Sequence, residues 1–158
     1  MTEAAWLTPQ RIELAGMILA SHRRAFAGPL LAGCTAARCP RQCAQELFSA
    51  TAAVLAHDGG ADPRLIYANR TALRLWRRDW DAMVGMPSRL TAGAGEQPAR
   101  AADLDRARSR EAISGYSGIR IDSDGRRFQI QNARLWNLRD GDGQPCGQAA
   151  SFESWWWL

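Results

Sequence analysis

The sequence predicts an α+β fold in which an antiparallel sheet carries helices on one face and is preceded by N-terminal helices. Three strand-like runs in residues 118–152 are joined by two Asp-Gly turns, which is typical of an antiparallel meander. Upstream, residues 65–68 form another strand-like run between segments whose apolar residues recur at helical spacing. Helices collected on one side of such a sheet would bury its apolar face.

The first 50 residues are predicted to be helical. Thr8 followed by Pro9 indicates a helix start, with Thr8 as the N-cap and proline at the first helical position. Apolar residues then recur at roughly helical spacing until the Gly-Pro pair at 28–29 ends the helix. A second helix is expected over residues 40–48.

The middle of the chain is predicted to alternate between short strands and short helices. Residues 51–56 can either end the second helix or form a strand, because their apolar run fits both. After the strand at 65–68, Asn69 is suited to cap the next helix. One or two short helices are expected over 70–83, and an Ala- and Arg-rich helix over 98–114.

The second strand of the meander leaves two possibilities for which face of the sheet its later side chains occupy. Phe128 and Ile130 share one face because side chains alternate along a strand. Unbroken alternation adds Trp136 to that face. A kink near Asn132 would turn Trp136 to the opposite face.

The last strand carries a polar residue among apolar neighbours. Alternation places Gln148 on one face with Cys146 and Phe152. Such a glutamine is either a ligand contact or a buried amide that hydrogen bonds to backbone.

Composition excludes several classes of protein. The chain has 158 residues, the size of one domain, and all 20 of its basic residues are arginine. Without lysine it can form neither a Schiff base nor the usual phosphate-binding loop. The net charge of +4 comes with interspersed acids and no basic run, so no nucleic-acid partner is expected. The known catalytic motifs are absent from the sequence, and no enzyme is predicted.

The sequence also predicts a compartment. The first twenty residues lack the pattern of a signal peptide, and no apolar run approaches the ~20 residues of a membrane span. We therefore expect a cytoplasmic protein with no membrane partner. In that compartment the four cysteines should be thiols or metal ligands and not disulfides.

Three of the cysteines form a C-x4-C-x3-C cluster at Cys34, Cys39 and Cys43. Cys39 and Cys43 would share one face of a helix, which makes the three residues weak candidates for a metal site. The CxxC spacing usual for zinc and iron–sulfur centres is missing. The alternatives are small buried apolar side chains or redox-sensitive thiols.

Six short segments, in order, resemble the MEKHLA domain, a PAS-related module found alone in bacteria and at the C-terminus of plant homeodomain–leucine-zipper transcription factors. The segments are His57 to Asn69, GMPSRLTA at 85–92, GYSGIR at 115–120, GRRF at 125–128, WNL at 136–138 and GQAASF at 147–152. The resemblance covers about residues 12–155 and corresponds to the stand-alone bacterial type. It implies an N-terminal helical segment at 1–50, a PAS-like core at 51–158, and a sensory or regulatory role with no identified cofactor.

PAS-like domains usually hold a ligand between the inner face of the sheet and the helices that cover it. The resemblance and the strand alternation together give nine candidate ligand contacts: Tyr67, Asn69, Trp76, Arg89, Arg120, Arg127, Phe128, Trp136 and Gln148. The arginines would clamp a carboxylate or phosphate, or else form surface ion pairs. The aromatic residues would line a pocket or fill the core, and the asparagine would contact ligand or cap a helix.

Flavin-binding light sensors carry a glutamine on the last strand, as this chain does at Gln148. Their cysteine-bearing helix motif is absent here, so covalent flavin photochemistry is not expected.

Three functions remain open from the sequence. The first is a small-molecule sensor that signals by contact with an unidentified protein. The second is a ligand-free dimerisation or protein-interaction module, and the third is a metal- or redox-responsive protein that uses the cysteine cluster.

The side chains of the run Trp155–Trp157 cannot all face one side of a strand, and exposed aromatics mark interfaces. PAS relatives commonly dimerise through the N-terminal helix and the outer sheet face, so a homodimer is expected.

Overall fold

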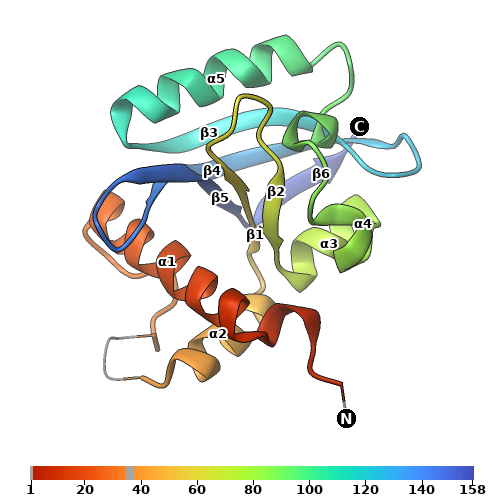
Figure 1. The fold of residues 1–158 in the computed structure, drawn as a ribbon. Helices are drawn as coiled ribbons and strands as arrows, with labels where there is room; N and C mark the ends of the chain where they lie inside the picture. The colour runs from red at the N-terminus through yellow and green to blue at the C-terminus, as the bar shows by residue number, and fades with distance from the viewer. Residues whose placement is uncertain (1, 35–37) are drawn as a thin grey trace.

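The computed structural model describes residues 2–34 and 38–158, and these contain one antiparallel sheet with helices on both of its faces (Figure 1). The strand order is β2-β1-β5-β4-β3, and β6 continues the line of β5 and pairs with β4. The strands are β1 (Ala53–Asp58), β2 (Leu65–Ala68), β3 (Ala112–Ile121), β4 (Arg127–Arg139), β5 (Pro145–Phe152) and β6 (Ser154–Trp157). The predicted α+β class is confirmed.

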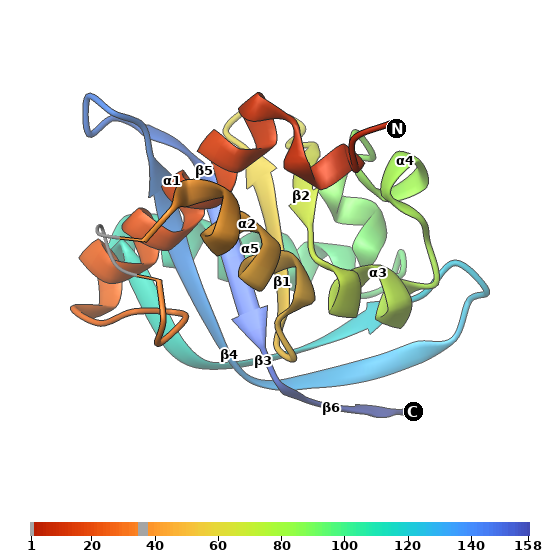
Figure 2. The ribbon, with the colours of Figure 1, turned by 90° about the horizontal axis from the view of Figure 1, so that it is seen from below.

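The helices divide between the two faces of the sheet. Apolar residues of α3 and α5 pack on the face that we call inner, and those of α1 and α2 pack on the outer face (Figure 2). The helices are α1 (Pro9–Phe26), α2 (Pro40–Ser49), α3 (Arg70–Trp76), α4 (Trp80–Met83) and α5 (Gln97–Arg110), with short 3-10 turns η1 (Ala5–Leu7) and η2 (Ser88–Thr91). Each face therefore has its own apolar core.

A reversal inside β4 supplies side chains to both cores. Phe128 and Ile130 belong to the inner core, whereas Trp136 and Leu138 belong to the outer core. Asn132 between them has a φ of 55°, a left-handed conformation that asparagine tolerates better than most residues. Of the two alternatives, the kink is confirmed, and the placement of Trp136 on the inner face is wrong.

A second irregularity lies at the start of β5. Leu138 pairs with Gly147 but Arg139 pairs with Pro145, so Cys146 is an extra residue that bulges out of the ladder. The Cys146 thiol packs on the outer side, 3.6 Å from the sulfur of Met17 in α1. The expectation that Cys146 shares a face with Gln148 is therefore wrong.

Most predicted boundaries agree with the structure, one open alternative is resolved, and one boundary needs correction. Residues 51–56, left open between helix and strand, contribute to β1. The helix predicted over 98–114 ends at Arg110, because Glu111 takes a φ of 67° and residues 112–114 begin β3. In the described part of the chain, no helix has the length and apolar character needed to cross a membrane.

Candidate functional site

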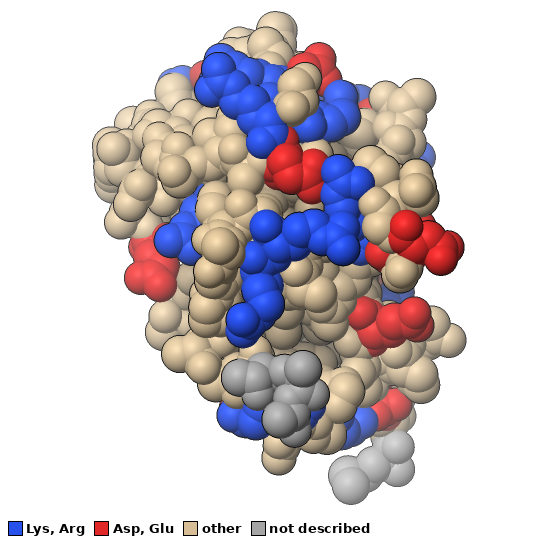
Figure 3. Space-filling model, turned by 90° about the vertical axis from the view of Figure 1, so that its left-hand side faces the viewer, with Lys and Arg blue, Asp and Glu red and all other residues tan. Residues whose placement is uncertain are grey.

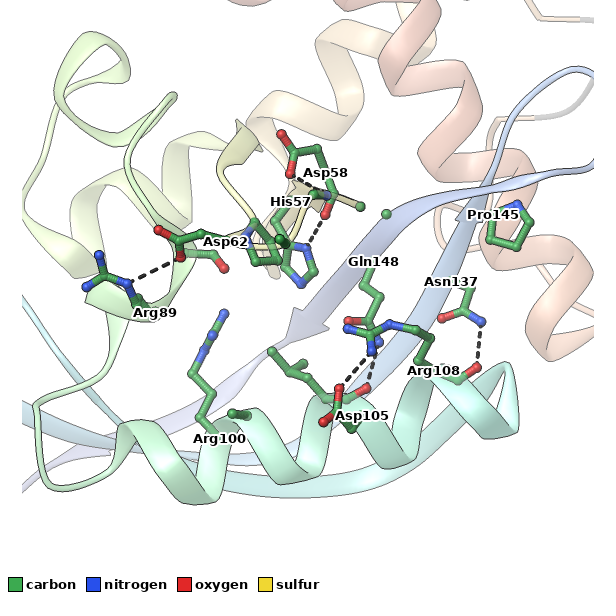
Figure 4. Close-up of a pocket in the computed structure, with 18 residues that line it drawn as sticks. His57, Asp58, Asp62, Arg89, Arg100, Asp105, Arg108, Asn137, Pro145 and Gln148 are labelled. Carbon is green, nitrogen blue, oxygen red and sulfur yellow. Dashed lines mark hydrogen bonds and ion pairs between the residues drawn. The ribbon is translucent and has the colours of Figure 1, made fainter.

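A cavity of about 660 Å³ opens on the inner side of the sheet (Figure 4). The β1–β2 hairpin and η2 form one wall, helix α5 forms the opposite wall, and β5 and β4 form the floor. The residues on these walls that carry charge or hydrogen-bonding groups are His57, Asp58, Asp62, Arg89, Arg100, Asp105, Arg108, Asn137 and Gln148.

An apolar recess of about 50 Å³ lies between this cavity and the inner core. His57, Arg100, Leu104 and Gln148 line both spaces, so the two are adjacent. The recess is walled by Trp76 and by aliphatic side chains of the inner core. A volume of this size has room for a group no larger than one or two water molecules.

Arg100 is the cation at the junction of the cavity and the recess. It projects from α5 toward His57 on the opposite wall (Figure 4). Within the described residues its guanidinium makes no ion pair or hydrogen bond, and its Nε is buried without a partner. Burial, together with the nearby charge of Arg120, lowers the pKa of Arg100 to about 10. The side chain therefore remains charged at pH 7 while lacking a counter-charge.

The acidic side chains of the cavity are already engaged. Asp105 pairs with Arg108 at 2.7 Å, and Asp62 pairs with Arg89 at 3.2 Å. Asp58 accepts hydrogen bonds from the backbone N–H groups of Gly60 and Arg64 in its own hairpin. These contacts leave the charge of Arg100 unbalanced.

His57 and Gln148 face each other across the β1–β5 ladder and present free acceptors. The Nδ1 of His57 lies 2.8 Å from the carbonyl oxygen of Asp58, so this nitrogen carries the hydrogen and Nε2 is an acceptor. The Gln148 amide donates to the carbonyl oxygen of Leu104 at 3.0 Å. Neither His57 Nε2 nor Gln148 Oε1, both buried, has a partner in the described part of the chain.

The ionisation of His57 follows from its position. Burial is the main cause that lowers the pKa of His57, and the positive charges of Arg100 and Arg108 lower it further. The imidazole is thus neutral near pH 7 and keeps its Nε2 lone pair. Asn137 Oδ1, on the floor of the cavity, is a third buried acceptor without a partner among the described residues. The arrangement of one unbalanced cation with three unpartnered acceptors is suited to binding a polar small molecule.

Four of the nine candidate ligand contacts lie at this site. Gln148 lines both spaces, Arg89 lines the cavity, and Trp76 and Arg120 line the recess. Phe128 lies nearby in the inner core, edge-on to Trp76 with 5.0 Å between ring centroids.

The other four candidates lie elsewhere. Tyr67 and Trp136 are fully buried in the outer core. Arg127 is exposed and pairs with Glu96. Asn69 caps α3 by accepting from the N–H of Ala72, which agrees with the capping interpretation.

Sequence reasoning missed the two central residues. His57 belongs to a segment that resembles the family, but its motif assigns it no chemistry. Arg100 sits among other arginines on a helix predicted from composition, and nothing in the pattern distinguishes it from them. Only the three-dimensional structure shows that this arginine alone of the α5 set points into the cavity without an acid.

The cysteine cluster lies at α2 and the segment before it, and it lines neither the cavity nor the recess. The Cys34 thiol donates to Glu46 at 3.1 Å, and its burial is the main cause that raises its pKa. Cys39 is exposed before the first turn of α2, where backbone N–H groups lower its pKa, and Cys43 is buried. Among the described residues, no group of three or more His, Cys, Asp or Glu side chains is placed to hold a metal ion.

Comparison with known families finds one match that spans nearly the whole chain. The family model of the MEKHLA domain matches residues 12–157. No curated protein sequence matches this chain.

Solved structures share its fold at low sequence identity. A PAS domain from Colwellia psychrerythraea superposes with a TM-score of 0.62 and 15% identity, covering 70% of this chain and 92% of the other. An RNA-binding light-oxygen-voltage receptor superposes with a TM-score of 0.65 and 20% identity, covering 78% of this chain and 35% of the receptor. A light-oxygen-voltage domain studied with a flavin analogue superposes with a TM-score of 0.58 and 18% identity, covering 74% of this chain and 84% of the other. The fold is therefore PAS-like.

Proposed function

The chain belongs to the MEKHLA domain family, and from this premise we propose that it is a sensory or regulatory domain that binds a small molecule in the inner cavity. The observation that carries the proposal is a set of groups without partners among the described residues that converge on a space of about 660 Å³: Arg100, His57, Asn137 and Gln148. Ligand sites in proteins commonly have about 300–1,000 Å³ and a few convergent polar groups. A module that acts only by dimerisation has no need to leave such groups without partners.

Small molecules fit the site better than nucleic acid does. On the face shown in Figure 3, basic side chains gather in a band that is broken by acids. Arg108 and Arg139 are paired with Asp105 and Glu111. A nucleic-acid surface instead presents a continuous basic stripe with free guanidinium groups. We propose no catalytic step for this protein. We propose that it is cytoplasmic.

The position of the cysteines bears on flavin chemistry. Cys34, Cys39 and Cys43 lie at the N-terminal helices and Cys146 lies against α1, so none of the four lines the cavity or the recess. A covalent adduct between a thiol and a ligand in the cavity is therefore not part of the proposed function.

The test of ligand binding is native mass spectrometry of the full chain purified without added ligand. We expect an adduct of small mass that is lost or weakened in an Ala101→Phe variant, because Ala101 lines the cavity and a phenyl ring there takes up space that the ligand would occupy. Ala99→Phe is the matched control, since Ala99 is exposed on the same helix outside the cavity. A bare chain in all three samples, with no binding from a metabolite library by thermal shift, would instead support an interaction module.

We propose that the chain forms a homodimer at β6 and that this dimer transmits the signal of ligand binding. The outer sheet face, expected as the dimer surface, is occupied by the chain's own α1 and α2. Trp155, Trp156 and Leu158 are 37%, 49% and 57% exposed. In the described structure β6 pairs only with β4, so its second edge is open to a second copy in a two-fold antiparallel pairing.

Light scattering tests the dimer. The wild-type chain should have the mass of a dimer, and a double variant Trp155→Ser, Trp156→Ser should be a monomer with unchanged circular dichroism. A wild-type monomer at about 100 μM, a concentration at which even weak dimers assemble, would exclude this partner.

A further inference from the structure

The cavity holds a positive charge for which the described part of the chain provides no counter-charge. Of the arginines that line it, Arg89 and Arg108 have aspartate partners and Arg100 has none among the described residues. An unpaired charge in a half-buried position is costly unless something binds it. Arg100 thus differs from Arg89 and Arg108, whose charges are balanced within the cavity.

A second guanidinium reinforces the field at the same point. Arg120, on β3, is 7% exposed and lines the recess together with Arg100. It is held in place by the hydroxyl of Tyr116 at 3.0 Å and the carbonyl oxygen of Ile119 at 2.9 Å, neither of which carries a charge. Two like charges thus approach each other where the medium is least able to screen them. The potential at the junction is that of a site for an anion.

The free acceptors define the rest of the ligand. His57 Nε2 and Gln148 Oε1 line the same junction and have no donor. An anion alone cannot satisfy them, because an oxyanion has only acceptors to offer. A hydroxyl next to the anionic group would donate to one of them and leave the second to water or to another hydroxyl.

We propose that the ligand is a small hydroxylated organic anion whose carboxylate or phosphate pairs with Arg100 and whose hydroxyl donates to His57 or Gln148. The inference rests on the proposed function, since it concerns the ligand of the same cavity. The planar fork of Arg100 suits bidentate contact with either oxyanion. The recess of about 50 Å³ limits any apolar part of the ligand at this end to roughly a methyl group.

Calorimetric titration of the full chain with matched probes tests the charge and the hydroxyl separately. Lactate against lactamide varies only the charge, and lactate against propionate varies only the hydroxyl. Glycerol 3-phosphate against lactate distinguishes a phosphate ligand from a carboxylate ligand, with glycerol as the neutral reference. We expect at least one anion to bind with millimolar affinity or better, with lactamide and glycerol weaker by about tenfold or more.

The variant that tests the assignment is Arg100→Gln, with Arg106→Gln as its control. Arg106 lies on the same helix but is exposed, pairs with Asp103 and does not line the cavity. The first substitution should weaken the best anion about tenfold or more, and the second should leave it within about twofold. Equal binding of lactate and lactamide, or an anion affinity unchanged in Arg100→Gln, would overturn the proposal.

Failure of this inference and failure of the proposed function give different results. If a purified adduct persists in Arg100→Gln, or a neutral molecule binds and is lost in Ala101→Phe, the cavity is a ligand site and the anion assignment is wrong. If neither anions up to about 50 mM nor neutral molecules bind, and no adduct is found, both are wrong. Binding at such concentrations corresponds to only a few kcal/mol, so a real site would be detected.

Discussion

The two faces of the sheet each bury a histidine, and they satisfy its ring in opposite ways. On the outer side His22 uses both nitrogens, with Nδ1 3.0 Å from the carbonyl oxygen of Gly28 and Nε2 3.2 Å from Arg134. On the inner side His57 uses only Nδ1. Burial lowers the pKa of both residues, so both rings are neutral near pH 7 and the difference lies in their partners.

Side-chain amides repeat this contrast. Asn69, beside α2, makes four hydrogen bonds, two as acceptor and two as donor. Gln148, beside the cavity, makes one and leaves its oxygen free. The outer side is built as a closed core in which only the Tyr67 hydroxyl, among the described polar groups of that cluster, lacks a partner. On the inner side, polar groups around the cavity lack hydrogen-bond partners. A binding site differs from a core in this respect.

Replacing the two amide residues, Asn69 and Gln148, should give the largest difference in stability between the outer and the inner face. Asn69→Ala leaves the backbone groups of Leu47, Ala52 and Val54 without their partner and removes the cap of α3. We expect a loss of about 3 kcal/mol in the free energy of unfolding, a fall of about 6–12 °C in Tm. Gln148→Leu, which breaks one bond, should cost about 1 kcal/mol or less. Equal losses in calorimetric melts would contradict the distinction between core and site.

Removal of the unbalanced charge should stabilise the protein. Arg100→Met keeps the apolar stem that lines the recess and eliminates a guanidinium without a partner. We expect a gain of about 1 kcal/mol, because residues kept for binding are often not optimal for stability. Arg106→Met, at an exposed ion pair, should change stability by about 0.5 kcal/mol or less. A Tm lower by several degrees in Arg100→Met would show that Arg100 has a structural role.

Much of the fold could be predicted because its signals are local. The turns at 122–125 and 140–143, the Thr8 cap and the Asn69 cap are all set by residues within a few positions of one another. The two errors of face, at Trp136 and Cys146, arise from single irregular residues that interrupt the alternation of a strand. One misplaced residue of this kind reverses every side chain that follows it.

The site was harder to predict because it is defined by what is missing. Arg89 and Arg127 resemble ligand-binding residues in sequence, and the structure pairs them with Asp62 and Glu96. Both acids are 27 or more positions away along the chain, so no local pattern reveals the pairing. Arg100 has no such distant partner, and the sequence cannot show an absence of that kind.

Acid should destabilise the free protein, partly through His57. Because the folded pKa of His57 lies below its unfolded value of 6.5, the unfolded chain takes up the proton first as pH falls. The stability due to the neutral ring is complete above about pH 6.5 and is lost as pH falls through the folded pKa. His22 acts in the same direction, so His57→Gln should reduce the loss between pH 7.5 and 5 without abolishing it. A loss of the same size in variant and wild type would contradict this.

A bound anion should oppose this effect. The charged groups that face His57 are Asp58 on its own strand and Arg100 and Arg108 on α5. An anion on Arg100 offsets the positive charge that lowers the pKa of His57, so binding raises that pKa. The affinity for lactate, whose carboxylate stays ionised in this range, should therefore rise between pH 7.5 and 5.5. A flat profile would place the anion away from His57.

The smallest expected effect is at Arg127, which has the same chemistry as Arg100 and the opposite environment. Its guanidinium is about half exposed and pairs with Glu96 just before α5. An ion pair of this exposure contributes about 0.5 kcal/mol or less, so Arg127→Gln should scarcely move the Tm. Because Arg127 lines neither the cavity nor the recess, anion affinity measured by calorimetry should stay within about twofold of wild type. A loss as large as that of Arg100→Gln would mean that anion binding responds to positive charge anywhere near α5, and not to the unpaired guanidinium of Arg100 in the cavity.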